Sequence, residues 1–282
     1  MIKIISDSTC DLSKDLIEKY NIGILPLHIL LGENEYIDGV NITPDEIYAW
    51  ADEHKTTPKT SAPSVDDAIN LFRPFIENGD EIICFSVSQS MSASYSVMNL
   101  AAEALDAEDK IHVIDSANLS TGVGLLVIEA AIMAAEGKKV SEIITCIEEI
   151  KPLVRSSFVV DTLTYLHRGG RCSAVAALAG GVLKLHPKIV VENGKMDATK
   201  KYRGKMDSVI LSYAKDMENE LLQAHGNRVF ITHAGCDDHI IDSVKEYLTS
   251  LNVFDEVLVT RAGAVISSHC GYGTLGVLFI SK

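Results

Sequence analysis

The sequence predicts a two-domain α/β protein, with a mostly parallel sheet in the first domain and a mixed sheet in the second. Three observations support this prediction. As far as about residue 153, apolar strand-like runs alternate with amphipathic helix patterns, an order typical of a parallel sheet. Polar and glycine residues recur where the strand-like runs end. In the second half, Asn193-Gly194 lies between two short runs and is a strong hairpin signal.

A soft boundary near Pro152 divides the chain into an N-terminal α/β domain, residues 1–153, and a C-terminal α/β domain, residues 154–282. No linker, repeat or low-complexity tract marks this boundary. We therefore expect the two domains to pack closely against each other. A chain of 282 residues is long enough to bury a large core in this way.

The composition is that of a soluble globular protein, with 47% hydrophobic and 23% charged residues. The net charge of −14 is repelled by phosphate backbones and by anionic lipid surfaces. Nucleic acid is therefore not an expected partner. A local pocket can still bind an anionic ligand if it supplies the donors.

The sequence also favours a cytoplasmic location. The six cysteines are scattered without a Cys-x-x-Cys pair, which suggests a reducing compartment and no disulfide framework. The first residues are too briefly apolar for a signal peptide. The most apolar long segment, Gly122 to Gly137, is interrupted by Glu129 and is shorter than a bilayer requires, so no membrane segment is expected.

In the first half, each strand is expected from a short apolar run and each helix from an apolar stripe with a polar start. Thr43-Pro44-Asp45-Glu46 predicts a helix start with a capping box. The expected strands lie at residues 3–6, 24–31, 81–87 and 110–114, with a hairpin excursion at 32–40. One helix is expected to follow residue 11, and two more should begin at Thr43 and Ser64. A fourth should end at Leu105, and the last two should cover residues 124–135 and 140–150.

The second half begins with a short strand over residues 157–160. A helical turn capped by Asp161 or Thr162 should follow, and it should stop at Gly169-Gly170. The later elements are a small-residue helix at 174–185, hairpin strands at 188–192 and 195–198, a long helix at 203–223, a strand at 228–233, a helix at 237–251 and strands at 253–260 and 277–280.

Arg171 follows the Gly169-Gly170 corner, where the backbone can approach a ligand closely. Its planar guanidinium can donate two parallel hydrogen bonds, so it suits a carboxylate or a phosphate. The alternative is a C-capped helix followed by a surface arginine. The residues of this stretch favour neither interpretation over the other.

Hydroxyl groups form the other recurring pattern. Thr60 and Ser61 lie in a proline-flanked segment expected to be a loop, and Ser92 and Ser94 lie where a strand becomes a helix with free N–H groups. His269 lies in a Ser-Ser-His-Cys-Gly-Tyr-Gly segment, also expected to be a loop. Each residue alone is typical of a cap or a surface loop. Together they are suited to donate to a small anionic head group.

Several catalytic motifs are absent from the sequence, including the phosphate loop, Gly-x-Gly-x-x-Gly after a strand, and Gly-x-Ser-x-Gly. His233, Cys236 and His239 are of metal-ligand type, but a strand end that runs into a helix would not bring all three together. We expect no catalytic residue, no metal and no cofactor other than a bound ligand.

The chain resembles the DegV family over its whole length. Short motifs in the right order carry this resemblance, and their number makes it specific. They are Ser6–Asp11, Thr60–Ser64, Ser88–Tyr95, Ile114–Gly122, Asp161–Arg171, Asn193–Lys195, Ile231–Cys236 and His269–Gly273.

The resemblance implies a two-domain DegV-like fold that holds one long-chain fatty acid in a buried tunnel. It further implies that the protein is the fatty-acid-binding subunit of a bacterial fatty acid kinase, presenting the carboxylate to a separate ATP-using subunit. The residues implied to bind the carboxylate are Thr60 or Ser61, Ser92 and His269, with Arg171 nearby; Ser94 and Gly170 are secondary candidates. His269 is expected to contribute most, as a donor that can carry positive charge.

Two departures from the family pattern concern the pocket mouth. Ala93 and Ser94 stand where the family usually has glycine and threonine, and Tyr272 stands where it usually has proline. Two alternatives to a fatty acid carrier remain at this point. One is a serine-dependent hydrolase that uses Ser92 or Ser94 with His269. The other is a lipid-sensing regulatory protein with a different partner.

Overall fold

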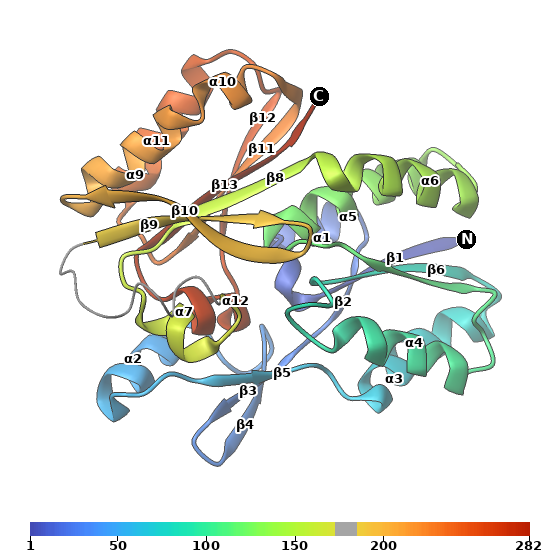
Figure 1. Ribbon diagram of the computed structural model, residues 1–282. Helices are drawn as coiled ribbons and strands as arrows, with labels where there is room; N and C mark the ends of the chain where they lie inside the picture. The colour runs from blue at the N-terminus through green and yellow to red at the C-terminus, as the bar shows by residue number, and fades with distance from the viewer. Residues whose placement is uncertain (173–184) are drawn as a thin grey trace.

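The computed structural model describes residues 1–172 and 185–282. It confirms the α/β fold, with a parallel sheet in the first half and a mixed sheet in the second (Figure 1). A small antiparallel sheet, which the sequence analysis only partly predicts, accompanies them. The small-residue helix expected at 174–185 lies almost entirely outside the described residues.

The parallel sheet has the strand order β2-β1-β6-β7, and every pair in it is parallel. Its strands are β1 (Ile2–Asp7), β2 (Gly23–Leu25), β6 (Glu81–Ser86) and β7 (Ile111–Asp115). Helices α3 (Val65–Glu77) and α4 (Ser94–Ala104) cover one face, while α5 (Thr121–Ala135) and α6 (Val140–Ile150) pack on the other. Coverage of both faces explains why β6 is almost continuously apolar.

The single strand expected at 24–31 is wrong. The chain forms β2, which ends at Leu25, and then β3 (His28–Leu31) in a different sheet. Pro26 lies between the two strands and has no backbone N–H to donate, so the pairing of β2 cannot continue through it. The second sheet has the order β4-β3-β5, with β4 (Asn34–Ile37) and β5 (Lys59–Ser61) antiparallel to β3.

The mixed sheet has the order β10-β9-β8-β13-β11-β12, in which only the β11–β12 pair is parallel. Its strands are β8 (Val154–Val159), β9 (Leu185–Glu192), β10 (Lys195–Arg203), β11 (Ala224–Ala234), β12 (Glu256–Arg261) and β13 (Thr274–Ser281). The β9–β10 hairpin confirms the signal at Asn193-Gly194, since both residues have positive φ. β8 begins at Val154, directly after the expected boundary, and the division into two domains stays a prediction.

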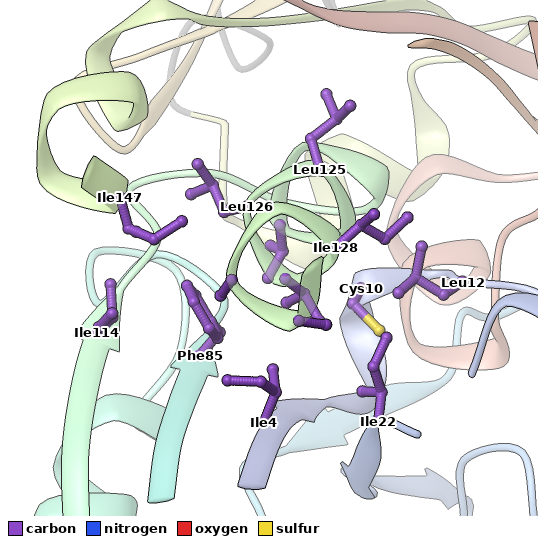
Figure 2. Close-up of a cluster of buried hydrophobic side chains, with 14 of the residues drawn as sticks. Ile4, Cys10, Leu12, Ile22, Phe85, Ile114, Leu125, Leu126, Ile128 and Ile147 are labelled. Carbon is purple, nitrogen blue, oxygen red and sulfur yellow. The ribbon is translucent and has the colours of Figure 1, made fainter. Parts of the chain in front are cut away.

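Helix α5 lies between the parallel and mixed sheets (Figure 1). One buried cluster joins it to Ile4 and Phe85 of the parallel sheet and to Phe230 and Leu278 of the mixed sheet. Figure 2 shows Leu125, Leu126 and Ile128 pointing outward from different sides of this helix. A helix that is apolar on nearly all sides is buried on nearly all sides, which explains the apolar run at 122–137. In the part of the chain that the structure describes, no helix could cross a membrane.

The remaining helices complete the two halves of the molecule. The first half contains η1 (Ser8–Cys10), α1 (Lys14–Lys19), α2 (Pro44–His54) and η2 (Lys151–Leu153), and the second half contains α7 (Thr164–Gly169), α9 (Met206–Asp216), α10 (Glu218–Leu221), α11 (Asp238–Ser250) and α12 (Ala264–Cys270). The capping box of α2 is confirmed, with Thr43 at the N-cap and Glu46 as its partner. The long helix expected at 203–223 is wrong, because β10 extends to Arg203 and a break at Met217 separates α9 from α10.

The N-cap of α7 lies one or two residues after the position expected from the sequence. The N-cap is Leu163, although the Thr162 hydroxyl still accepts a hydrogen bond from the Thr164 N–H at 3.3 Å. The expected end of the helix is confirmed, since Gly170 adopts the left-handed conformation with φ of 70°.

Candidate functional site

A cavity of about 250 Å³ lies where the two halves of the chain meet. From the first half, its walls include residues that follow strands of the parallel sheet: Thr9 after β1, Met91 after β6 and Leu119 after β7. The mixed sheet contributes Phe158 and Leu278. The cavity thus lies at the carboxyl ends of parallel strands, where open α/β sheets bind their ligands. Most of its lining is apolar.

Helix α12 forms one side of this cavity through Val265, Ile266 and His269. The lining also includes Thr60, Ser61, Ser92 and Arg171. The structure therefore brings all five principal candidate residues to the cavity from four separate parts of the chain. The secondary candidates Ser94 and Gly170 are not among the lining residues.

His269 and Thr60 form a direct pair. The Thr60 Oγ1 and His269 Nε2 atoms are 2.7 Å apart and share a hydrogen bond. The expected loops are wrong for both residues, because Thr60 lies in the edge strand β5 and His269 lies in the last turn of α12. The His269 Nδ1 atom is buried and has no hydrogen-bond partner within the described part of the chain.

Burial, and to a smaller extent the nearby Arg171 cation, lowers the pKa of His269 to about 4. The imidazole is therefore neutral at pH 7 in the ligand-free site, and its positive charge beside a bound carboxylate stays a prediction. A carboxylate placed beside this ring would favour its protonated form and raise its pKa.

Gly169 permits the close approach of α7 to α12. A Cβ atom at this position would lie 2.5 Å from His269 Nδ1, which is shorter than any normal contact. Arg171 follows two residues later, and its NH1 donates to the Gly169 carbonyl at 2.7 Å. Its Nε donates to the Met91 carbonyl at 3.4 Å. The exposed guanidinium thus links α7 to the segment that carries Ser92.

Ser92 belongs to a chain of hydrogen bonds that leads into the parallel sheet. The Ser92 and Ser94 hydroxyl oxygens are 2.9 Å apart, and the Ser94 N–H donates to Ser92 Oγ at 3.3 Å. Ser94 in turn interacts with the buried carboxyl of Asp7, which also accepts from Val87 N at 2.8 Å. Burial raises the pKa of Asp7 to about 6.

Two buried acids missed by the sequence analysis hold the start of α12. The Gly263 N–H donates to Asp11 Oδ1 at 2.7 Å, and the Ala264 N–H donates to Asp38 Oδ1 at 2.9 Å. Burial raises the pKa of both carboxyls, and that of Asp11 reaches about 8. The polar cluster at 6–11 offered a signal for Asp11, whereas nothing near Asp38 in the sequence indicates a contact 226 residues away.

His233, Cys236 and His239 have separate surroundings. The Cys236 thiol donates to the Thr274 carbonyl at 3.4 Å, and His239 Nε2 lies 3.3 Å from Asp207 Oδ2. Within residues 1–172 and 185–282, no group of three or more His, Cys, Asp or Glu side chains could hold a metal ion.

The fold and the site together define an α/β protein whose two halves enclose a mostly apolar cavity with hydroxyl and imidazole groups in its lining. The family model described as uncharacterised protein, DegV family, matches residues 1–282. The chain belongs to the DegV family. A DegV domain-containing protein of Caldanaerobacter subterraneus is 31% identical over 283 residues, covering 100% of this chain and 99% of the relative.

Solved structures are also similar to this chain over its whole length. A fatty-acid-binding DegV family protein from Thermus thermophilus superimposes with a TM-score of 0.92 at 28% identity, covering 100% of this chain and 99% of that chain. A stearic-acid-binding protein from Eubacterium ventriosum superimposes with a TM-score of 0.86 at 32% identity, with the same coverage. Both likenesses extend over the two halves of the molecule.

Proposed function

We propose that this protein binds one long-chain fatty acid in the cavity between its two halves and presents the carboxylate to an ATP-dependent kinase partner. The partner would transfer the terminal phosphoryl group of ATP to a carboxylate oxygen, which gives acyl phosphate and ADP. The observation that carries the proposal is the cavity itself, whose lining is mostly apolar and includes the hydrogen-bonded pair of Thr60 and His269.

The apolar walls suit an acyl chain. Burial of each methylene group contributes roughly 0.8 kcal/mol, so most of the affinity comes from the chain and not from the head group. Side chains such as Phe158, Met196 and Leu278 supply this environment from three strands of the mixed sheet. The fatty acids bound by relatives of known structure fit the same interpretation.

The hydroxyl and imidazole groups of the lining suit a carboxylate. A buried carboxylate needs hydrogen-bond donors, because an unpaired buried charge is strongly unfavourable. We assign this role to Thr60, Ser61, Ser92 and His269, with Arg171 at the exposed edge. The unpartnered buried nitrogen of His269 supports this assignment, since protonation on ligand binding would make the ring donate from both nitrogens.

The hydrolase alternative has less support from the geometry. A nucleophile and its base should be within hydrogen-bond reach, and a third group should orient the base. The partner of His269 Nε2 is Thr60, and the hydroxyl partner of Ser92 is Ser94. No observation favours the regulatory alternative over the carrier.

Native mass spectrometry of the purified chain tests the ligand. We expect a mass increase that corresponds to one long-chain fatty acid, removable by delipidation and restored by added oleate. A chain that is empty and does not take up oleate would contradict the proposal.

Incubation with a kinase subunit and ATP tests the second step. The oleate-loaded chain should form a complex with the subunit in a pull-down assay and yield hydroxylamine-sensitive acyl phosphate. If oleate binds but neither complex nor product forms, the lipid-sensing alternative would replace the kinase proposal.

A further inference from the structure

The tip of the β9–β10 hairpin lies against the first half of the chain. In Figure 1 this hairpin extends from the mixed sheet toward the parallel sheet. The Gly194 carbonyl at its tip accepts a hydrogen bond from Ser88 Oγ at 2.8 Å and another from Ser90 Oγ. These contacts join residues more than a hundred positions apart and cross from one half of the molecule to the other.

The fit at this contact is close. Asn193 and Gly194 have φ of 49° and 76°, the conformation of a two-residue turn that matches the twist of the strands. A Cβ atom added to Gly194 would lie 2.6 Å from Ser88 Oγ. Position 194 therefore needs glycine for two independent reasons, its positive φ and its contact with Ser88.

The contact leads directly to Ser92. Ser88 is buried, and its carbonyl accepts from the N–H groups of Met91 at 2.8 Å and Ser92 at 3.2 Å. The Ser90 N–H donates to Ser88 Oγ at 3.3 Å, which closes the turn from the other side. The segment from Ser88 to Ser92 is thus one compact turn, anchored at Gly194 and carrying Ser92 into the cavity wall.

We infer that the Gly194 carbonyl is a positioning group for Ser92, and that docking of the hairpin tip on Ser88 and Ser90 sets the affinity for the fatty acid head group. This inference rests on the function proposed above. The same hairpin places Met196 in the cavity lining, so one element contributes to the wall and aligns a head-group donor. The hairpin acts through Ser92 and does not itself contact the carboxylate.

Ser90→Ala is the first test, because Ser90 is exposed and the substitution removes one bond to Gly194 with little effect on folding. We expect amide hydrogen exchange over residues 88–92 of the ligand-free chain to become about three- to tenfold faster, the effect of one lost hydrogen bond. Ser90→Thr keeps the hydroxyl and should restore slow exchange. Unchanged exchange in Ser90→Ala would overturn the inference, whether or not the chain binds a lipid.

A double-mutant cycle then tests whether the contact acts through Ser92. Calorimetry should show that Ser90→Ala weakens oleate binding about three- to tenfold in the parent chain and has no further effect in Ser92→Ala. If Ser90→Ala lowers oleate affinity equally in the parent chain and in Ser92→Ala, the Ser90 contact has a general structural role that does not act through Ser92. That result would overturn the inference. A parent chain that binds no oleate would instead contradict the proposed function, and the exchange measurement would still decide the role of the hairpin.

Gly194→Ala has a matched control in Gly137→Ala. Both glycines have nearly the same positive φ, 76° and 78°, but a Cβ at Gly137 meets nothing within 4 Å. Backbone strain is therefore similar in the two variants, and only Gly194→Ala disturbs Ser88. We expect faster exchange over residues 88–92 in Gly194→Ala alone. The same change in Gly137→Ala would show that strain and not the contact is responsible, which would overturn the inference.

Discussion

Helices α5 and α12 both lie between the two halves of the chain, but they are held in different ways. α5 is 15 residues long, is mostly apolar and contacts the two sheets mainly through hydrocarbon side chains, apart from an ion pair of Glu129 with Arg228 and a hydrogen bond of Thr121 to β11. α12 is 7 residues long, and buried carboxyls hold its first turn while His269 in its last turn bonds to Thr60. The hydrophobic contacts of α5 are not directional, whereas the polar contacts of α12 fix the position of each atom.

Because of this difference, we expect α5 to contribute mainly to the stability of the fold and α12 mainly to recognition of the ligand. Substitutions in α5 should lower the free energy of unfolding and leave the head-group site unchanged in the molecules that remain folded. Substitutions around α12 should change ligand affinity or pH dependence with a smaller effect on stability.

Leu126→Ala should lower the free energy of unfolding by about 2–5 kcal/mol, because it removes buried methyl groups and leaves a cavity in the core shared by both sheets. Urea denaturation measures this change. Leu222→Ala is the matched control, since Leu222 is 50% exposed and should change stability by less than about 0.5 kcal/mol. Similar losses in the two variants would contradict the central role assigned to α5.

Ser92→Ala and His269→Ala should each weaken oleate binding by about 1–3 kcal/mol, because one head-group donor is lost and the others remain. His269→Gln should lose less than His269→Ala, since the glutamine amide can still donate a hydrogen bond to the carboxylate. Ser96→Ala is the control, because Ser96 is exposed on α4 and does not line the cavity. If calorimetry gives both Ser92→Ala and His269→Ala the same oleate affinity as the parent, the carboxylate does not lie beside these two residues.

The pH dependence of stability should reveal the buried acids at the start of α12. The pKa of Asp11 is about 8 in the folded chain, against about 3.9 in an unfolded one, so the folded state binds more protons between these values. Stability should therefore fall as pH rises from about 4 to about 8, by at most about 1.4 kcal/mol per pH unit for one group. Asp7 adds a contribution of the same sign over the lower part of this range.

Asp11→Asn mimics the protonated carboxyl and can still accept from the Gly263 N–H. Urea denaturation at several pH values should show a shallower slope in this variant than in the parent chain. Asp109→Asn serves as a control at an exposed acid for which no change in slope is expected. A slope unchanged by Asp11→Asn would mean that this carboxyl does not hold its proton in the folded state.

Arg171→Ala should have the smallest effect on oleate affinity, because the guanidinium is exposed at the edge of the site. Its loss should reduce acyl phosphate formation by the kinase partner more strongly, since charge develops on the transferring group. Arg168→Ala is the control, as Arg168 is an exposed arginine of α7 outside the cavity lining. Equal losses in binding and in product formation would place Arg171 on the ground-state carboxylate alone.

Local signals predicted much of the fold. The capping box at Thr43 and the hairpin at Asn193-Gly194 depend on neighbouring residues, and both are confirmed. Errors arose where a distant partner decides the structure. Thr60 forms a strand only because β3 pairs with it, and the helix that contains His269 begins at N–H groups that bond to Asp11 and Asp38 from the other half of the chain.

The same reasoning applies to the site. Hydroxyls and an imidazole in separate segments suggested the candidates, and the structure places the five principal ones around one cavity. Sequence could not indicate the neutral state of His269, which depends on its burial and on Arg171. It also could not indicate the contact of Gly194 with Ser88, because that contact forms only when the hairpin meets the other half.

Carbon-13 NMR of oleate labelled at its carboxyl carbon tests the location of the head group most directly. In the complex with the parent chain, we expect a single bound signal whose chemical shift differs from that of free oleate and moves in Ser92→Ala and in His269→Gln, but not in Ser96→Ala. Such a result would place the carboxylate beside the Thr60–His269 pair. A bound signal that is the same in all four proteins would contradict this account, because the carboxylate would then lie elsewhere in the molecule.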